Sequence, residues 1–202
     1  MESIRQSILG ILQADVQNDG LKFDDASLVV ESIREEVTYG GVRAKFRAHL
    51  GKVRIPVQVD IGFGDAVVPG PQFRRFPALL PELPTASLAV YPACTVIAEK
   101  FEALVRLDAQ NTRMKDFFDL NFLLGTGTSD KAQLANAIHA TFKRRGTELP
   151  DQIPTGLSEN FARDKQVMWK AFLRKNGLDH ETAELSPMLA GIRKSLEWVW
   201  TI

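Results

Sequence analysis

Residues 41–62 of this chain read GVRAKFRAHLGKVRIPVQVDIG. Every second side chain is apolar over 42–50 and again over 53–61, which is the period of a strand with one buried face. Gly51-Lys52 lies between the two runs and suits a two-residue turn. The stretch is therefore predicted to form an antiparallel hairpin.

The turn also fixes the register of this hairpin. With Gly51-Lys52 as the loop, the apolar faces of the two strands coincide, as a stable register requires. On the polar face, Arg43 then lies opposite Asp60, and Lys45 lies opposite Gln58.

A third strand is predicted before this hairpin, with Ile33, Val37 and Tyr39 on its apolar face and Gly40-Gly41 as its turn. This register places Thr38 beside Arg43 and Glu36 beside Lys45.

Outside the meander, the spacing of apolar residues is helical. Helices are expected near 3–17, 93–107, 113–124, 130–145, 158–175 and 182–200. Residues 65–92 are rich in proline and are expected to be an extended linker. The chain is thus divided into an α/β part over 1–92 and a helical domain over 93–202.

Composition is that of an ordinary soluble globular protein, with 45% hydrophobic and 25% charged residues and a formal net charge of zero. Binding to nucleic acid would therefore need a local basic patch. The single cysteine, Cys94, rules out an internal disulfide framework, suits a reducing cytoplasm, and is expected to be packed in the core. Neither a membrane span nor a signal peptide is recognisable.

Asp60 is the first candidate for chemistry because it ends a strand just before the glycine-rich turn at 62–64. A carboxylate in this place can bind Mg²⁺ or orient a hydroxyl nucleophile. The alternative is a plain cross-strand ion pair with Arg43. Asp65, in the following loop, is more typical of a turn.

Lys100 is the second candidate because it shares the apolar stripe of the predicted helix 93–107. Its ammonium either reaches out to solvent or points into a cleft, where it can hold a triphosphate. The sequence does not choose between the two.

The third candidate is the start of the helix predicted at 113–124, where Asn111 or Thr112 can cap the first turn. Arg113, Lys115, Asp116 and Asp119 concentrate charge within two turns. They form either local ion pairs on an ordinary amphipathic helix or part of a site.

Lys143-Arg-Arg145 ends another predicted helix just before Gly146. Three cations there favour the helix C-terminus through its dipole, and an RNA-phosphate patch is the alternative. The histidines have no partner at metal-ligand spacing, and Trp169, Trp198 and Trp200 are expected to pack in the core.

Three segments together resemble nucleotidyltransferases of the AbiEii/AbiGii toxin family. They are Val59-Asp-Ile-Gly-Phe-Gly-Asp65, Val96-Ile-Ala-Glu-Lys-Phe-Glu-Ala-Leu104 after Tyr91-Pro92, and Thr112-Arg-Met-Lys-Asp-Phe-Phe-Asp-Leu120. The similarity continues through 140–150 and covers nearly the whole chain.

This resemblance implies an α+β fold, with an incomplete polymerase-β-like nucleotidyltransferase core and a helical C-terminal lobe. It implies Mg²⁺ and a nucleoside triphosphate as cofactor and substrate, with Asp60 as metal ligand and, with Lys100, as catalytic residue. Lys100, Arg113, Lys115 and Asp116 match nucleotide-binding positions. The implied partners are a cognate antitoxin from the same operon and, for some members, the ends of tRNA.

The sequence departs from the family pattern at its start. No Gly-Gly/Ser loop or Asp-x-Asp strand precedes Asp60, and Asp24-Asp25 are adjacent rather than alternating. Because two-metal transfer needs several carboxylates, this polypeptide alone is expected to be inactive. The alternatives are a non-catalytic module that binds nucleotide, RNA or antitoxin, and a complete enzyme whose gene begins further upstream. The strand at 53–61 is expected to be an open edge, covered by the N-terminal helix or by a second copy in a homodimer.

Overall fold

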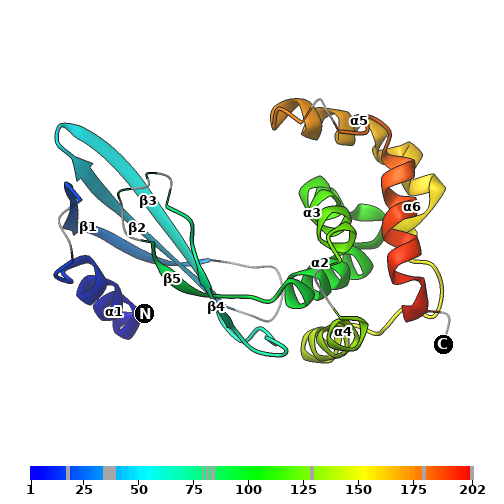
Figure 1. The fold of residues 1–202 in the computed structure, drawn as a ribbon, viewed down its shortest axis with the longest axis horizontal. Helices are drawn as coiled ribbons and strands as arrows, with labels where there is room; N and C mark the ends of the chain where they lie inside the picture. The colour runs from blue at the N-terminus through cyan, green and yellow to red at the C-terminus, as the bar shows by residue number, and fades with distance from the viewer. Residues whose placement is uncertain are drawn as a thin grey trace. The chain divides into compact units, whose positions relative to one another are not determined.

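The computed structural model of this chain describes residues 1–16, 19–33, 40–78, 80, 82, 85–127, 130–178 and 181–200. It has an α+β fold, as predicted, with two small antiparallel sheets and six α-helices in the described part (Figure 1). The chain divides into two compact units, Met1–Asp65 and Ala66–Ile202.

The first unit contains one helix and a three-stranded sheet. Its elements are α1 (Glu2–Leu12), β1 (Leu21–Ile33), β2 (Gly41–Leu50) and β3 (Val53–Gly62), and the strand order is β1-β2-β3.

The β2–β3 hairpin has the predicted register throughout. Leu50 lies opposite Val53, and Arg43 lies opposite Asp60. Gly51 has a φ of 57°, the conformation that a turn with glycine at its first central position requires and that glycine adopts without steric cost.

The predicted register of the preceding strand is wrong. Residues 34–39, which include Thr38 and Glu36, lie outside the described residues, while the strand that pairs with β2 is 21–33. Glu31 lies opposite Arg43, and Val29 lies opposite Lys45.

A register shift between Asp24 and Val29 explains why no regular alternation marks β1 in the sequence. Ser27 stabilises this irregularity, since its hydroxyl donates to the Asp24 carbonyl at 2.6 Å and accepts from the Arg47 N–H at 2.9 Å.

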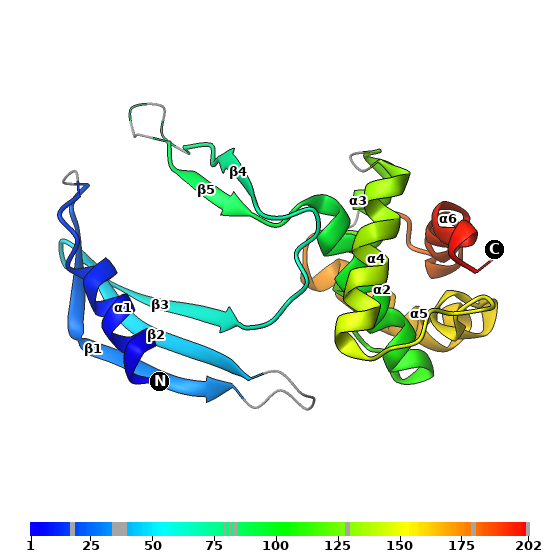
Figure 2. The same ribbon diagram turned by 90° about the horizontal axis from the view of Figure 1, so that it is seen from below.

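Helix α1 lies across one face of this sheet (Figure 2). The cluster between them contains the buried side chains of Ile8, Leu28, Ala44 and Phe46. The helix ends at Leu12 rather than near residue 17, and the Gln13 side chain donates to Asp25 at 2.7 Å. The opposite face carries the charged row, with Arg43–Asp60, Lys45–Glu31 and Arg47–Asp24 as ion pairs.

The second unit contains a two-stranded sheet and a helical core. Its elements are β4 (Gln72–Arg75), β5 (Ser87–Val90), α2 (Ala93–Leu107), η1 (Asp108–Gln110), α3 (Met114–Gly125), α4 (Lys131–Arg145), η2 (Thr155–Leu157), α5 (Glu159–Lys175), α6 (Leu185–Leu196) and η3 (Glu197–Val199). The helices predicted for this unit are thus confirmed, and most of their ends lie within a few residues of the predicted ends.

The proline-rich segment is not only an extended linker, because β4 and β5 within it pair as an antiparallel ladder. Pro71 and Pro77 lie outside β4, and Pro92 follows β5. The ladder therefore loses no N–H donor to these prolines.

Helix α2 is central to the second unit and packs against α3 and α4. Phe101 on α2 is fully buried, and its ring centroid lies 5.5 Å from that of Phe142 on α4. Cys94 is buried as expected, and so is Trp169; Trp198 and Trp200 pack against the same core. Among the described helices, none is long and apolar enough to cross a bilayer.

Candidate functional site

Lys100 projects from α2 toward α3, and its side chain is 19% exposed. Its ammonium lies 2.8 Å from Asp116 Oδ1 and 2.8 Å from Asp119 Oδ2. The head group thus turns to two carboxylates of α3 rather than running out into solvent. That it faces a cleft that holds a triphosphate stays a prediction.

The start of α3 positions the two acceptors. The Asn111 side chain accepts a hydrogen bond from the Arg113 N–H at 2.9 Å, just before the helix begins at Met114. Asp116 and Asp119 are three residues apart, so they share the helix face that meets Lys100.

Two further cations approach the same carboxylates from the outside. Arg113 Nε lies 2.8 Å from Asp116 Oδ2, and Lys115 Nζ lies 2.6 Å from Asp119 Oδ2. The side chains of Arg113 and Lys115 are 56% and 72% exposed. We call the set Lys100, Arg113, Lys115, Asp116 and Asp119 the Lys100 cluster.

The charges in the cluster are set by competing effects. Burial lowers the pKa of Lys100, but hydrogen bonds and Coulomb attraction from Asp116 and Asp119 outweigh it, so the pKa is raised. Burial raises the pKa of Asp119, but its bonds to Lys100 and Lys115 lower it overall. Lys100 therefore stays protonated at neutral pH, and the cluster contains three cationic side chains against two carboxylates.

This arrangement suits an anion. The carboxylates hold the cations in place from the inside, and Arg113 and Lys115 present their charge to solvent. A guanidinium can bind a phosphate through two parallel hydrogen bonds, while an ammonium binds it as a point charge.

Asp60 belongs to the first unit and is not part of the Lys100 cluster. Arg43 donates to both of its carboxylate oxygens, at 2.7 and 2.8 Å, as the cross-strand alternative predicts. The Arg43 hydrogen bond outweighs the opposing effect of desolvation and lowers the pKa of Asp60. That Asp60 and Lys100 act together as catalytic residues, as the family resemblance implies, stays a prediction.

The described residues do not fit a magnesium site by themselves. They contain no group of three His, Cys, Asp or Glu side chains that could hold a metal ion, and the Asp60 carboxylate is already engaged by a guanidinium.

A family model described as nucleotidyl transferase AbiEii toxin, type IV TA system, matches residues 1–201. The chain belongs to this AbiEii family. No match was found among curated proteins or among solved structures.

Glu102 of this AbiEii family member lies two residues after Lys100 and is fully buried, and it was not among the residues predicted from the sequence. Its carboxylate binds Arg106 at 3.0 Å, Arg145 at 2.7 Å and the Thr147 hydroxyl at 2.7 Å. In the sequence, the i, i+4 spacing of Glu102 and Arg106 was the signal that could have indicated this ion pair. The contact explains one cation of Lys143-Arg-Arg145, while Gly146 ends α4 with a φ of 64°.

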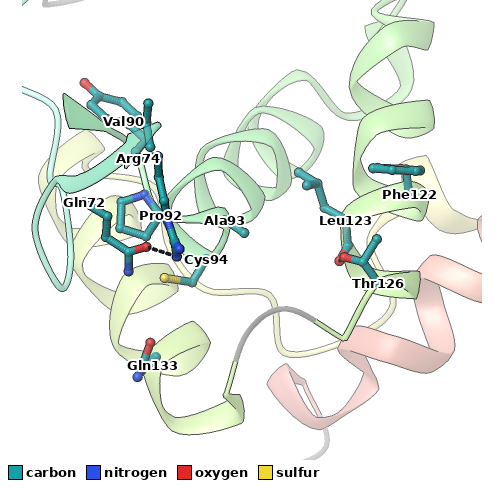
Figure 3. A pocket seen from close by; sticks show the side chains of 11 residues that line it. Gln72, Arg74, Val90, Pro92, Ala93, Cys94, Phe122, Leu123, Thr126 and Gln133 are labelled. Atoms are coloured by element: carbon teal, nitrogen blue, oxygen red, sulfur yellow. Dashed lines mark hydrogen bonds between the residues drawn. The ribbon is translucent and has the colours of Figure 1, made fainter. Parts of the chain in front are cut away.

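The second unit also contains a pocket of about 330 Å³ (Figure 3). Its lining includes Arg74 from β4, Cys94 from the start of α2, Phe122 and Thr126 from the end of α3, and Gln133 from α4. Arg74 donates to Gln72 at 2.8 Å. No residue of the Lys100 cluster is among those that line it.

Proposed function

We propose that the Lys100 cluster binds the phosphates of a nucleoside triphosphate in the nucleotidyl transfer of this toxin. The observation that carries the proposal is the convergence of three cations, Lys100 of α2, Lys115 of α3 and Arg113 just before α3, on two carboxylates. Because the cations outnumber the carboxylates, the cluster retains positive charge for an incoming anion.

The roles of the residues follow from their exposure. Arg113 and Lys115 are exposed and make the first contacts with phosphate. Lys100 and Asp116 lie deeper and hold α2 and α3 together, with Lys100 as the residue nearest to the chemistry by family resemblance. The triphosphate then takes the place of solvent around the outer cations without breaking the inner pair.

The resemblance further implies Mg²⁺ bound by Asp60, the end of a tRNA as acceptor, and a cognate antitoxin as partner. Since the described residues do not form a magnesium site, we assign no step of the reaction to a metal. The two exposed cations are suited to phosphate with or without a metal ion bound to it.

The test is calorimetric titration of the full chain with each of the four ribonucleoside triphosphates, with and without Mg²⁺. Arg113→Ala and Lys115→Ala should each weaken binding about tenfold, since each removes a charge-assisted contact. Lys175→Ala, which removes an exposed lysine of α5 without a partner among the described residues, is the matched control and should bind like the parent.

Transfer is measured separately, by incorporation of labelled nucleotide into tRNA. Binding without transfer would favour the non-catalytic module, which the same cluster serves equally well. Triphosphate binding that is absent, or unchanged in the Arg113→Ala/Lys115→Ala double variant, would contradict the proposal and leave the cluster with a structural role only.

A further inference from the structure

Strand β3 is the edge of its sheet in the described part of the chain, because it pairs with β2 on one side only. An open strand edge presents N–H and C=O groups that can extend the sheet with another strand. The question is which strand fits this particular edge.

The two-residue turn determines which groups of β3 point outward. In such a hairpin the residues that flank the turn, here Leu50 and Val53, exchange hydrogen bonds with each other. Hydrogen-bonded pairs recur at every second position, so the main-chain groups of Arg54, Pro56, Gln58 and Asp60 point away from β2.

The side chains of β3 are also incompletely covered. On the α1 face, Val57 and Ile61 pack against the small core, whereas Val53 and Val59 are 59% and 42% exposed. On the polar face, Arg54 has no ion-pair partner within the described residues.

We propose that β3 pairs antiparallel with β3 of a second copy of this chain, with Val57 facing Val57 across a two-fold axis. Arg54 of each copy then lies opposite Asp60 of the other. On the apolar face, Val53 meets Ile61 and Val59 meets Ile55. The pairing gives Arg54 an ionic partner and covers both exposed valines.

The self-complementary register is specific. A shift of one residue would bring main-chain groups that point toward β2 in one copy against groups that point away from β2 in the other. It would also place the apolar side chains on the wrong face of the sheet. A shift of the pairing by two residues in one direction would put Pro56 against Pro56, where neither has an N–H. The same shift in the other direction would put Asp60 against Pro56 and leave Arg54 opposite Gly62.

Pro56 is compatible with the proposed register at a limited cost. It lies opposite Gln58 of the other copy, so the Pro56 carbonyl still accepts a main-chain hydrogen bond. Each copy lacks one main-chain donor, because Pro56 has no N–H. The ladder would contain about six main-chain hydrogen bonds. Asp60 would accept from Arg43 of its own chain and Arg54 of the other, within the capacity of a carboxylate. The pairing uses none of the Lys100 cluster, so it does not depend on the phosphate binding proposed for that cluster.

Disulfide trapping in the full chain tests the register. In the proposed pairing, the two copies of residue 57 form a non-hydrogen-bonded pair with Cα atoms about 4.5 Å apart, within the range for a disulfide. Val57→Cys should therefore give a covalent dimer under mild oxidation. The native Cys94 is buried and serves as the background in all variants.

Val59→Cys is the matched control, because its two copies would lie roughly 13 Å apart along the ladder and should not be linked. A mixture of Ile55→Cys and Val59→Cys chains should be linked. Equal linking at positions 57 and 59 would indicate random collision and overturn the proposal.

Sedimentation equilibrium of the unmodified chain should show a reversible dimer. Arg54→Glu should raise its dissociation constant at least about tenfold, because two like-charged pairs replace two opposite ones. Arg54 has no ion-pair partner in the part of its own chain that the structure describes, so this variant should keep its fold, which circular dichroism checks. A monomer at all concentrations, or a dimer that is indifferent to Arg54→Glu, would overturn the proposal.

Discussion

Asp119 accepts ion pairs from two lysines, Lys100 at 2.8 Å and Lys115 at 2.6 Å. Its pKa is lowered from 3.8 in the folded protein, with burial opposing and the two lysines producing the decrease. A group with a lowered pKa stabilises the fold above its ordinary pKa, and this stabilisation is lost as the pH falls through the folded pKa. The window for this effect therefore lies below about pH 4.

Asp119→Asn should accordingly destabilise the second unit by about 1 kcal/mol at pH 7, and the difference from the parent should vanish toward pH 2. Urea unfolding followed by tryptophan emission measures it, since all three tryptophans lie in this unit. Asp164→Asn, on the exposed side of α5, is the control. A difference that persists at pH 2 would mean that the charge of Asp119 is not its cause.

For single residues, the sequence predicted contacts between side chains that lie close together along the chain. The Arg43–Asp60 pair follows from the hairpin register, and Lys115–Asp119 follows from helical spacing. The contact between Lys100 and Asp116 spans two helices, so only the resemblance placed both residues in one site.

Between elements, α2 and α4 are joined by a buried polar contact as well as by apolar packing. Glu102 on α2 is fully buried, and Arg145 at the end of α4 reaches it at 2.7 Å. A buried carboxylate needs paired donors, because leaving its charge uncompensated is costly. Arg145 thus holds the end of α4 to α2 through Glu102.

Arg145→Ala should destabilise the second unit by about 2–3 kcal/mol, less than a fully broken buried pair because Arg106 and Thr147 remain with Glu102. Lys143→Ala, which removes an exposed cation from the same helix end, should change stability by less than about 0.5 kcal/mol. Thermal unfolding of both variants checks this. Equal effects would show that the helix dipole, and not Glu102, accounts for the cations.

The helices were predictable because an apolar stripe of period 3.6 belongs to each segment separately. Strand β1 was not predictable in this way, since its bulge between Asp24 and Val29 interrupts the alternation of apolar and polar side chains. The β4–β5 hairpin was obscured by prolines that lie beside the strands, where they disturb no ladder bond.

For the whole molecule, the two units have separate cores. The buried cluster of the first contains Ile8, Leu28, Ala44 and Phe46, whereas that of the second extends over α2 to α6. A small cluster buries little apolar surface, so the first unit is expected to be marginally stable alone. This agrees with the proposed dimer, which would bury more of it.

A fragment of residues 66–202 should therefore fold by itself. Its helical circular dichroism and tryptophan emission should match those of the full chain, with a thermal midpoint within about 3 °C. An aggregated fragment, or a clearly lower midpoint, would show that the second unit depends on the first.

The sequence alone determined the β2–β3 register, the order and approximate limits of the helices, and the family, because each of these depends on the spacing of residues close together in the chain. Only the tertiary structure decided that Lys100 turns to α3, that Glu102 holds the end of α4, and that β3 remains an edge within the described residues. Those features depend on which helix faces and strand edges meet across many residues of chain. The packing of whole elements, rather than any local period, sets that outcome.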